Sequence, residues 1–96
     1  MSLTVVELTY KVDPAEITEL RPAHLEWLRE GLAAGKLVLS GRKMPVTGGM
    51  LIVRGDVDAA RAWCESDPFA LADVADYRYF AFEPSMAAPG LESLLA

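Results

Sequence analysis

The sequence predicts an α+β domain in which one four-stranded antiparallel sheet carries two helices on one face. Four segments have the alternating polarity or β-branched composition of strands, and two segments have helical spacing with capping residues at their ends. Along the chain these segments follow the order β-α-β-β-α-β, which is the split βαβ arrangement of ferredoxin-like folds. No internal repeat or low-complexity segment suggests another architecture.

The first strand and the first helix are expected in the N-terminal third of the chain. Residues 3–11 alternate polar and apolar side chains, as a half-buried strand does. The stretch "DPAE" then supplies a capping aspartate and a proline at the first helical position. Because Pro22 should interrupt a helix, we expect a short turn over 14–20 and a main helix over 21–34, ended by Gly35.

A β-hairpin and a second helix are expected next. Strands over 36–42 and 49–55 are joined by the turn "MPVTGG", and this short connection favours direct antiparallel pairing. Asp56 is expected to cap a helix over 57–66, whose apolar residues recur at helical spacing. Pro68 should end that helix.

The last strand and a tail complete the predicted organisation. Residues 77–83, "YRYFAFE", are rich in aromatic side chains and are expected to form the fourth strand. We therefore expect residues 1–83 to form the domain and residues 84–96 to form a tail with a last helical turn at "LESLLA". Whether the tail packs at a dimer interface or stays mobile is left open by the sequence.

With both helices on one side, the other face of the sheet has no cover within the chain. A contiguous apolar patch of this kind is commonly an association surface. We therefore predict a homodimer in which two sheets pack face to face. The residues expected on this face are Val5, Leu37, Leu39, Ile52, Tyr79 and Ala81.

Composition limits the compartments and partners that suit the chain. Its 96 residues suffice for one domain, and its 52% hydrophobic content excludes a disordered chain. No apolar run reaches the roughly 18 residues of a membrane span, so no membrane partner is expected. The net charge of −5, with nine basic residues scattered among fourteen acidic ones, argues against nucleic acid. A single cysteine and the lack of a secretory signal indicate the cytoplasm.

The only histidine, His24, lies in "RPAHLEWL", on the apolar stripe of the predicted main helix and near the edge of that stripe. One interpretation is a half-buried side chain that is hydrogen-bonded to a backbone carbonyl. The other is a pocket in which a proton is moved. No second histidine and no paired cysteine spacing accompany it, so we expect no metal site within one chain and no cofactor.

Three further positions carry candidate chemistry. Asp67 precedes a proline and therefore suits a helix cap, and it could also orient an imidazole by accepting from a ring N–H. Ser40 and Gly41 end the second strand, where a glycine marks either a β-bulge or the close approach of a ligand or another backbone. Cys64 is expected to pack in the core.

Taken together, "RPAHLEWLREG", "GKLVLSG", "TGGMLIV" and "CESDPF", followed by an aromatic strand, resemble the YciI-like (YCII-related) family over residues 3 to 83. The resemblance implies a ferredoxin-like α+β fold that dimerises through its sheets, as in dimeric α+β barrels. It also implies an active-site cleft built on a His–Asp pair, which falls on His24 and Asp67 here. The other matching positions are Arg21, Ser40, Gly41, Pro68 and Phe69.

The chain departs from the family pattern after its second strand. Many members carry Gly-Pro there, whereas this chain has Arg42 and Lys43. We therefore expect a more cationic pocket rim, which would suit an anionic substrate such as a carboxylate or a phenolate.

Two hypotheses of function follow. In the first, the chain is a small cofactor-independent enzyme of isomerase, lyase or hydrolase type, in which His24 exchanges a proton and Asp67 holds its tautomer. Arg21 or Arg42 would neutralise the substrate, with Ser40 as a hydrogen-bond donor and Phe69 as a further binding residue. In the second hypothesis, the chain is a non-catalytic dimeric module that binds a small molecule or serves as an accessory subunit. The His–Asp pair then fixes helix packing.

Overall fold

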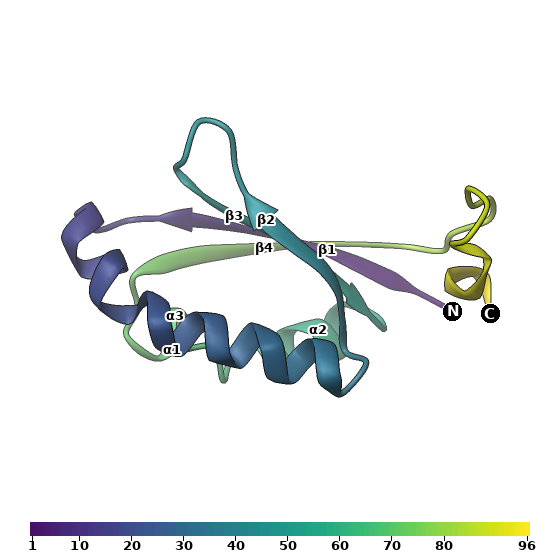
Figure 1. Cartoon of the computed structure of the whole chain (residues 1–96), viewed down its shortest axis with the longest axis horizontal. Helices are drawn as coiled ribbons and strands as arrows, with labels where there is room; N and C mark the ends of the chain where they lie inside the picture. The colour runs from purple at the N-terminus through teal and green to yellow at the C-terminus, as the bar shows by residue number, and fades with distance from the viewer.

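In the computed structural model, which describes residues 1–96, four strands form one antiparallel sheet in the order β2-β3-β1-β4 (Figure 1). The expected strands are all present, with ends that differ from the predicted ones by a residue or two. This order and pairing confirm the ferredoxin-like α+β fold. The strands are β1 (Leu3–Tyr10), β2 (Leu37–Arg42), β3 (Gly48–Arg54) and β4 (Ala75–Phe82).

The helices pack on one face of this sheet. The longest, α1 (Pro14–Ala33), runs along the sheet (Figure 1), and α2 (Val57–Cys64) packs against β4, β1 and β3. The short helix α3 (Pro68–Leu71) contacts α1 and β4. As expected, the Asp56 side chain caps α2 by accepting the Ala59 N–H at 2.9 Å.

The predicted break at Pro22 is wrong, because α1 runs through it without interruption. Pro22 and Thr18 both lie on the exposed side of the helix, so the Thr18 carbonyl that loses its i→i+4 partner faces water. On the opposite side, the buried Ile17 and His24 anchor the turns before and after the proline. The helix does end as expected, with Gly35 at a φ of +76°, where glycine has no Cβ to hinder it.

The hydrophobic core fills the space between the helices and the sheet. At its edge Trp27 stacks on Trp63, with ring centroids 3.9 Å apart. This stack depends on Gly31, because a Cβ at that position would lie 2.3 Å from the Trp63 ring. The buried core residues are Val6, Leu8, Ile17, Trp27, Leu28, Leu37, Leu51, Val53, Ala60, Cys64, Phe69, Val74 and Ala75.

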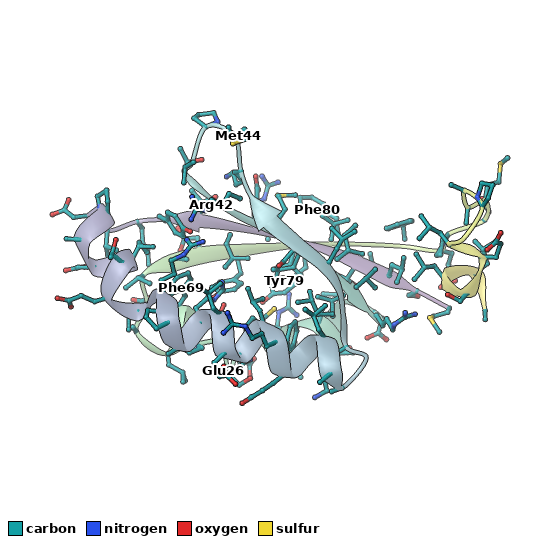
Figure 2. All side chains as sticks on the ribbon, in the orientation of Figure 1. Glu26, Arg42, Met44, Phe69, Tyr79 and Phe80 are labelled. Carbon is teal, nitrogen blue, oxygen red and sulfur yellow. The ribbon has the colours of Figure 1, made fainter.

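Three of the residues expected on the uncovered face lie on the helix side instead. Leu37 is buried in the core, because a register shift between Leu37 and Leu39 in β2 reverses which face each residue takes. Tyr79 also packs against the core, and Ala81 shares its side of β4 because residues two apart on a strand face the same way. Figure 2 shows Tyr79 and Phe80 on opposite sides of the sheet.

The uncovered face is nevertheless apolar. Phe80 and Phe82 remain 48% and 47% exposed, and Leu39 is 54% exposed. The strand pairings place their side chains on the same face as three further apolar residues that are partly exposed. The apolar residues of this open face are Val5, Leu39, Met50, Ile52, Phe80 and Phe82.

The C-terminal tail, residues 84–96, lies beside the N-terminus at one end of the sheet (Figure 1). The Met1 amino group is 3.2 Å from a carboxylate oxygen of Glu83, just before the tail. A short 3-10 turn, η1 (Glu92–Leu95), lies where the sequence predicts a last helical turn. Among the helices, none combines the length and the apolar character needed to cross a membrane.

Candidate active site

The histidine and the aspartate singled out in the sequence lie against each other between the helices and the sheet. His24 Nδ1 is 2.8 Å from Asp67 Oδ1. His24 is on the buried side of α1, which also carries Trp27 and Leu28. The Asp67 side chain is fully buried, whereas the His24 side chain keeps 11% of its surface exposed. The partner of the ring is therefore a buried carboxylate and not a backbone carbonyl.

Asp67 is held in place because it caps a helix. Its backbone is extended immediately before α3, and its Oδ1 accepts the Phe69 N–H at 3.0 Å. Pro68 favours this turn, since its φ is preset and it has no N–H to satisfy. The other oxygen, Oδ2, accepts the hydroxyl of Tyr77 from β4 at 2.6 Å. Asp67 is thus both a helix cap and the hydrogen-bond partner of His24. Both roles were considered for it in the sequence.

These contacts determine which imidazole nitrogen is available. An ionised carboxylate can only accept hydrogen bonds, so His24 Nδ1 carries a hydrogen toward Asp67, and in the neutral form of the ring Nε2 carries the lone pair. Nε2 has no hydrogen-bond partner in the chain, and no buried side-chain nitrogen or oxygen lacks a partner. Nε2 is therefore accessible from outside the protein.

Aromatic rings fix the plane of the imidazole. The Phe69 ring stacks on it with centroids 4.0 Å apart and planes within 9°. Trp27 lies 5.9 Å away at 29°, and Tyr10 packs edge-on against Phe69. The ring consequently has little freedom to turn away from Asp67.

A cavity of about 220 Å³, the inner cavity, opens beside the imidazole. The residues predicted for the site, apart from Asp67, all line it, and Asp67 is behind the histidine. They are Arg21, His24, Ser40, Gly41, Arg42 and Phe69. The remaining wall is largely apolar and comes from Leu8, Tyr10, Leu25, Leu28, Gly48, Gly49 and Leu51.

The close backbone approach considered at Gly41 occurs at another glycine. A Cβ on Gly41 would meet no atom within 4 Å, because this part of β2 faces open space. A Cβ on Gly48 would lie 1.8 Å from the Leu8 carbonyl oxygen, so Gly48 is the position that requires glycine. The irregularity in β2 falls between Leu37 and Leu39 and not at the Ser-Gly strand end.

Of the two cations that were expected to make the rim cationic, only Arg42 lines the inner cavity. Lys43 lines neither this cavity nor the larger one beside it, since its Nζ lies 3.2 Å from Glu7 and 3.1 Å from the Thr9 hydroxyl. Both partners belong to the side of β1 that faces away from the helices. Successive strand residues point to opposite faces, so Arg42 and Lys43 diverge.

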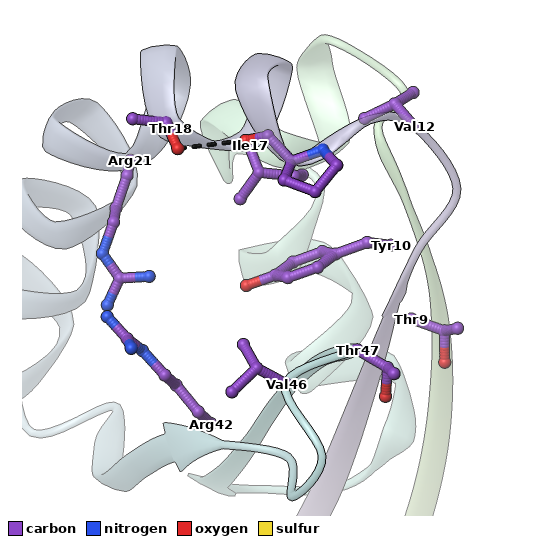
Figure 3. A pocket seen from close by; sticks show the side chains of 10 residues that line it. Thr9, Tyr10, Val12, Ile17, Thr18, Arg21, Arg42, Val46 and Thr47 are labelled. Carbon is purple, nitrogen blue, oxygen red and sulfur yellow. Dashed lines mark hydrogen bonds between the residues drawn. The ribbon is translucent and has the colours of Figure 1, made fainter.

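A larger outer cavity, of about 580 Å³, adjoins the inner one (Figure 3). Tyr10, Arg21 and Arg42 line both cavities and therefore stand between them. Figure 3 shows the two arginine side chains extending toward each other, one from α1 and one from the end of β2. Val12, Ile17 and Val46 make the outer cavity partly apolar.

No other side chain near the pair is a strong nucleophile or part of a metal-binding cluster. Burial, with a contribution from the Asp67 charge, raises the pKa of the Cys64 thiol to about 12. Burial and the nearby Asp67 likewise raise the pKa of Tyr77 above its usual value of 10. Both groups therefore stay protonated at neutral pH. The chain holds no cluster of three His, Cys, Asp or Glu side chains that could bind a metal ion.

Sequence reasoning missed three aromatic residues of the site. Tyr77 holds Asp67, Tyr10 stands between the cavities, and Trp27 borders the imidazole. The alternation in "YRYFAFE" places Tyr77 on one face of a strand, but strand pattern alone does not show which loop its hydroxyl meets.

A comparison with protein families identifies relatives of this chain. The model of a family described as the YCII-related domain matches residues 3–83. A search of curated proteins found no match.

Two solved structures share the fold. One is 5-chloro-2-hydroxyhydroquinone dehydrochlorinase (TftG) from Burkholderia phenoliruptrix AC1100, in complex with 2,5-dihydroxybenzoquinone. It has 19% identity and a TM-score of 0.69, over 88% of this chain and 95% of that one. The other is a variant of SnoaB, a cofactor-independent oxygenase from Streptomyces nogalater, with 16% identity and a TM-score of 0.50, over 92% and 97% of the two chains.

Proposed function

This chain belongs to the YCII-related domain family, and on that premise we propose that it is a small cofactor-independent enzyme in which His24 exchanges a proton with a small organic substrate. The observation that carries the proposal is the anchored imidazole beside the inner cavity. Its Nδ1 is held by the buried Asp67, while its Nε2 has no partner in the chain. A general base needs this combination of fixed tautomer and open lone pair.

Each residue of the site then has a distinct role. His24 Nε2 takes a proton from the substrate and returns it to the substrate or to the leaving group. Asp67 holds the tautomer and stabilises the imidazolium that forms. Tyr77 is a positioning residue, since it contacts Asp67 and does not line the inner cavity. Ser40 is placed to donate a hydrogen bond to the substrate, and Arg21 and Arg42 to neutralise its charge.

The fold neighbours support a small-molecule reaction of this kind. TftG is a dehydrochlorinase that was crystallised with a quinone, and SnoaB is described as cofactor-independent. Dehydrochlorination is an elimination, in which a base removes a proton and chloride leaves. The lyase type therefore stands first among the isomerase, lyase and hydrolase types that a proton-exchanging histidine can serve.

The test is turnover of a substrate panel by matched variants. The panel holds chlorinated hydroquinones, assayed by chloride release, and enolisable ketones, assayed by deuterium uptake. His24→Gln should lower the rate on any accepted substrate by roughly 10²–10⁴-fold. Glu26→Gln, an exposed change on the same helix, is the matched control and should leave the rate unaltered. Undiminished turnover by His24→Gln would contradict the proposal.

A non-catalytic binding module remains the second candidate, and one observation favours it. The imidazole is stacked on Phe69 and tied to a fully buried carboxylate, an arrangement that also suits a helix-packing contact. In that case His24→Gln should cost about 1–3 kcal/mol in the free energy of unfolding, from buried groups left without partners. A loss below about 1 kcal/mol, together with a large loss of turnover by the same variant on an accepted substrate, would favour the enzyme instead.

The open face supports the proposal that the enzyme is a homodimer formed sheet to sheet. Phe80, Phe82 and Leu39 are each about half exposed there. A contiguous apolar surface of this kind is rarely left bare on a monomer. Analytical ultracentrifugation at micromolar concentration should show a dimer, and Phe80→Lys should shift it to a monomer. A wild-type monomer under these conditions would refute the dimer.

The cytoplasm is the compartment we propose for this enzyme, on the basis of its single cysteine, which is buried and free. Cell fractionation tests this location directly. Recovery of the protein in an extracytoplasmic fraction would contradict it.

A further inference from the structure

The two arginines between the cavities have no acidic partner in the chain. Three other arginines lie within 4.0 Å of a carboxylate: Arg29, Arg61 and Arg78. Neither Arg21 nor Arg42 has such a neighbour, although acidic residues outnumber basic ones by fourteen to nine. Two like charges brought together without a counterion repel, and an anion placed between them would relieve that repulsion.

The surroundings of the arginines also favour an anion. No aspartate or glutamate lines either cavity. In the view of Figure 3 the Arg21 and Arg42 side chains extend toward each other across the cavity that both line, and the Tyr10 hydroxyl points to the same side. A guanidinium presents a planar fork of donors that fits the two oxygens of a carboxylate. The tips of two such side chains therefore form a receptor for one carboxylate.

The two cavities set the size and polarity of the rest of the ligand. The inner cavity, of about 220 Å³, has four leucines and the rings of Tyr10 and Phe69 among its walls. A cavity of about 150 Å³ is enough for benzene, so one six-membered ring with small substituents fits here. The outer cavity has apolar walls from Val12, Ile17 and Val46, which suit an aliphatic substituent.

We propose that the substrate is an amphipathic carboxylic acid whose carboxylate binds between Arg21 and Arg42. Its ring-sized skeleton occupies the inner cavity against His24, and a substituent on the carbon that bears the carboxylate extends into the outer cavity. This inference rests on the proposed function, because it names the substrate class of the same site. It places a carbon next to an acid group within reach of the proton-exchanging nitrogen.

Binding by defined probes tests this inference without any need for turnover. Phenylacetate and its neutral isostere phenylacetamide are titrated into ¹⁵N-labelled protein, with the Nε–Hε signals of Arg21 and Arg42 as the readout. The carboxylate should bind at least about tenfold more tightly than the amide, because its hydrogen bonds to both guanidiniums are charge-assisted. 2-Phenylhexanoate, whose butyl chain reaches the outer cavity, should bind more tightly than phenylacetate.

Matched variants assign the effect to the arginines. Arg21→Met and Arg42→Met keep an apolar stem, and each should abolish most of the preference for the carboxylate while leaving amide binding unchanged. Arg54→Met is the control, because Arg54 also lacks an acidic neighbour but lines a different cavity beside Trp63. It should keep the full preference.

The outcomes separate this inference from the proposed function. His24→Gln should still bind phenylacetate, so a failure of the catalytic role would leave the anion site intact. Equal binding of acid and amide, or an unchanged preference in Arg42→Met, would overturn the carboxylate assignment. The carboxylate assignment would also be overturned if phenylacetate at about 10 mM changed neither arginine signal, because that concentration should populate even a site with a Kd of about 1 mM. Equal affinity for the butyl-bearing acid would overturn the use of the outer cavity.

Discussion

Two pairs of side chains near the same inner cavity are built in opposite ways. His24 and Asp67 are buried, and three donors converge on the Asp67 carboxylate: the imidazole, the Phe69 amide and the Tyr77 hydroxyl. Arg21 and Arg42 have no acidic partner and stand between two openings. The first pair is completed by the fold itself. The second has no counterion within the chain.

The difference separates groups that preserve geometry from groups that recognise a ligand. A buried carboxylate with all its partners contributes to stability as well as to orientation, so its removal should damage the fold. Solvent-reachable cations contribute little to stability, so their removal should affect binding alone. If the two pairs differ in this way, substitutions around Asp67 should lower the free energy of unfolding most and a substitution of Arg42 least.

Asp67→Ala should have the largest effect. It leaves the Tyr77 hydroxyl, the Phe69 amide and His24 Nδ1 without their acceptor, and it removes the cap of α3. We expect a loss of about 3–5 kcal/mol, the usual cost of removing one member of a buried pair. Urea unfolding followed by circular dichroism measures this loss. Asp67→Asn, which keeps an acceptor oxygen, is the control, and an Asp67→Ala loss under about 1 kcal/mol would contradict the network.

Alkaline pH should weaken the fold through the groups around Asp67. The pKa of Cys64 rises from 9.0 to about 12 on folding, and the pKa of Tyr77 also rises, in both cases mainly because of burial. The native state therefore keeps protons that the unfolded chain releases above about pH 9, and stability falls as pH increases beyond that point. The slope should approach about 1.4 kcal/mol per pH unit for each group.

Thermal unfolding between pH 8 and pH 11 measures this slope. Cys64→Ala should remove the part that begins near pH 9, whereas Glu26→Gln should leave the profile unchanged. Stability that stays flat over this range in the wild-type protein would show that the two groups are not protected by burial.

Tyr77→Phe should have a moderate effect on stability. It removes one hydrogen bond to the buried carboxylate while keeping the ring, so we expect a loss of about 1–2 kcal/mol. As a positioning residue, Tyr77 should also affect kcat more than KM, because the substrate does not touch it. An unchanged kcat on an accepted substrate would limit Tyr77 to a structural role. Glu26→Gln, an exposed change away from this network, is the control.

Arg42→Ala should have the smallest effect on stability. The side chain is exposed and has no acidic partner, so the free energy of unfolding should change by less than about 0.5 kcal/mol. Urea denaturation, in parallel with Asp67→Ala, gives the comparison directly. A loss as large as that of Asp67→Ala would show that the arginine is part of the structural framework and would remove the contrast between the two pairs.

The sequence anticipated the parts of the site that follow from local rules. The Asp-Pro pair specified a helix cap, and helical spacing placed His24 on the buried face. Their contact, however, requires α3 to lie against α1, which depends on packing between elements distant in the chain. The resemblance to a family implied that His24 and Asp67 act together. Helical spacing and capping patterns alone did not show whether the two side chains are in contact.

The errors at Pro22 and Leu37 come from tertiary structure that overrides local preference, whereas others neglected the alternation of side chains along a strand. Pro22 remains in α1 because buried contacts on either side of it, through Ile17 and His24, outweigh the loss of one hydrogen bond at the surface. Leu37 turns inward because of an irregularity in β2 that no turn residue announces. Lys43 was grouped with Arg42, although adjacent strand residues face opposite ways.

The central claim is that His24 presents a free Nε2 to the cavity while Asp67 holds its Nδ1. Long-range ¹H–¹⁵N spectroscopy of the imidazole tests this claim most directly, before and after the addition of phenylacetate. We predict a hydrogen on Nδ1 and an Nε2 signal that shifts when the probe binds. A hydrogen located on Nε2 and not on Nδ1, or an Nε2 signal that ignores the bound probe, would contradict this claim.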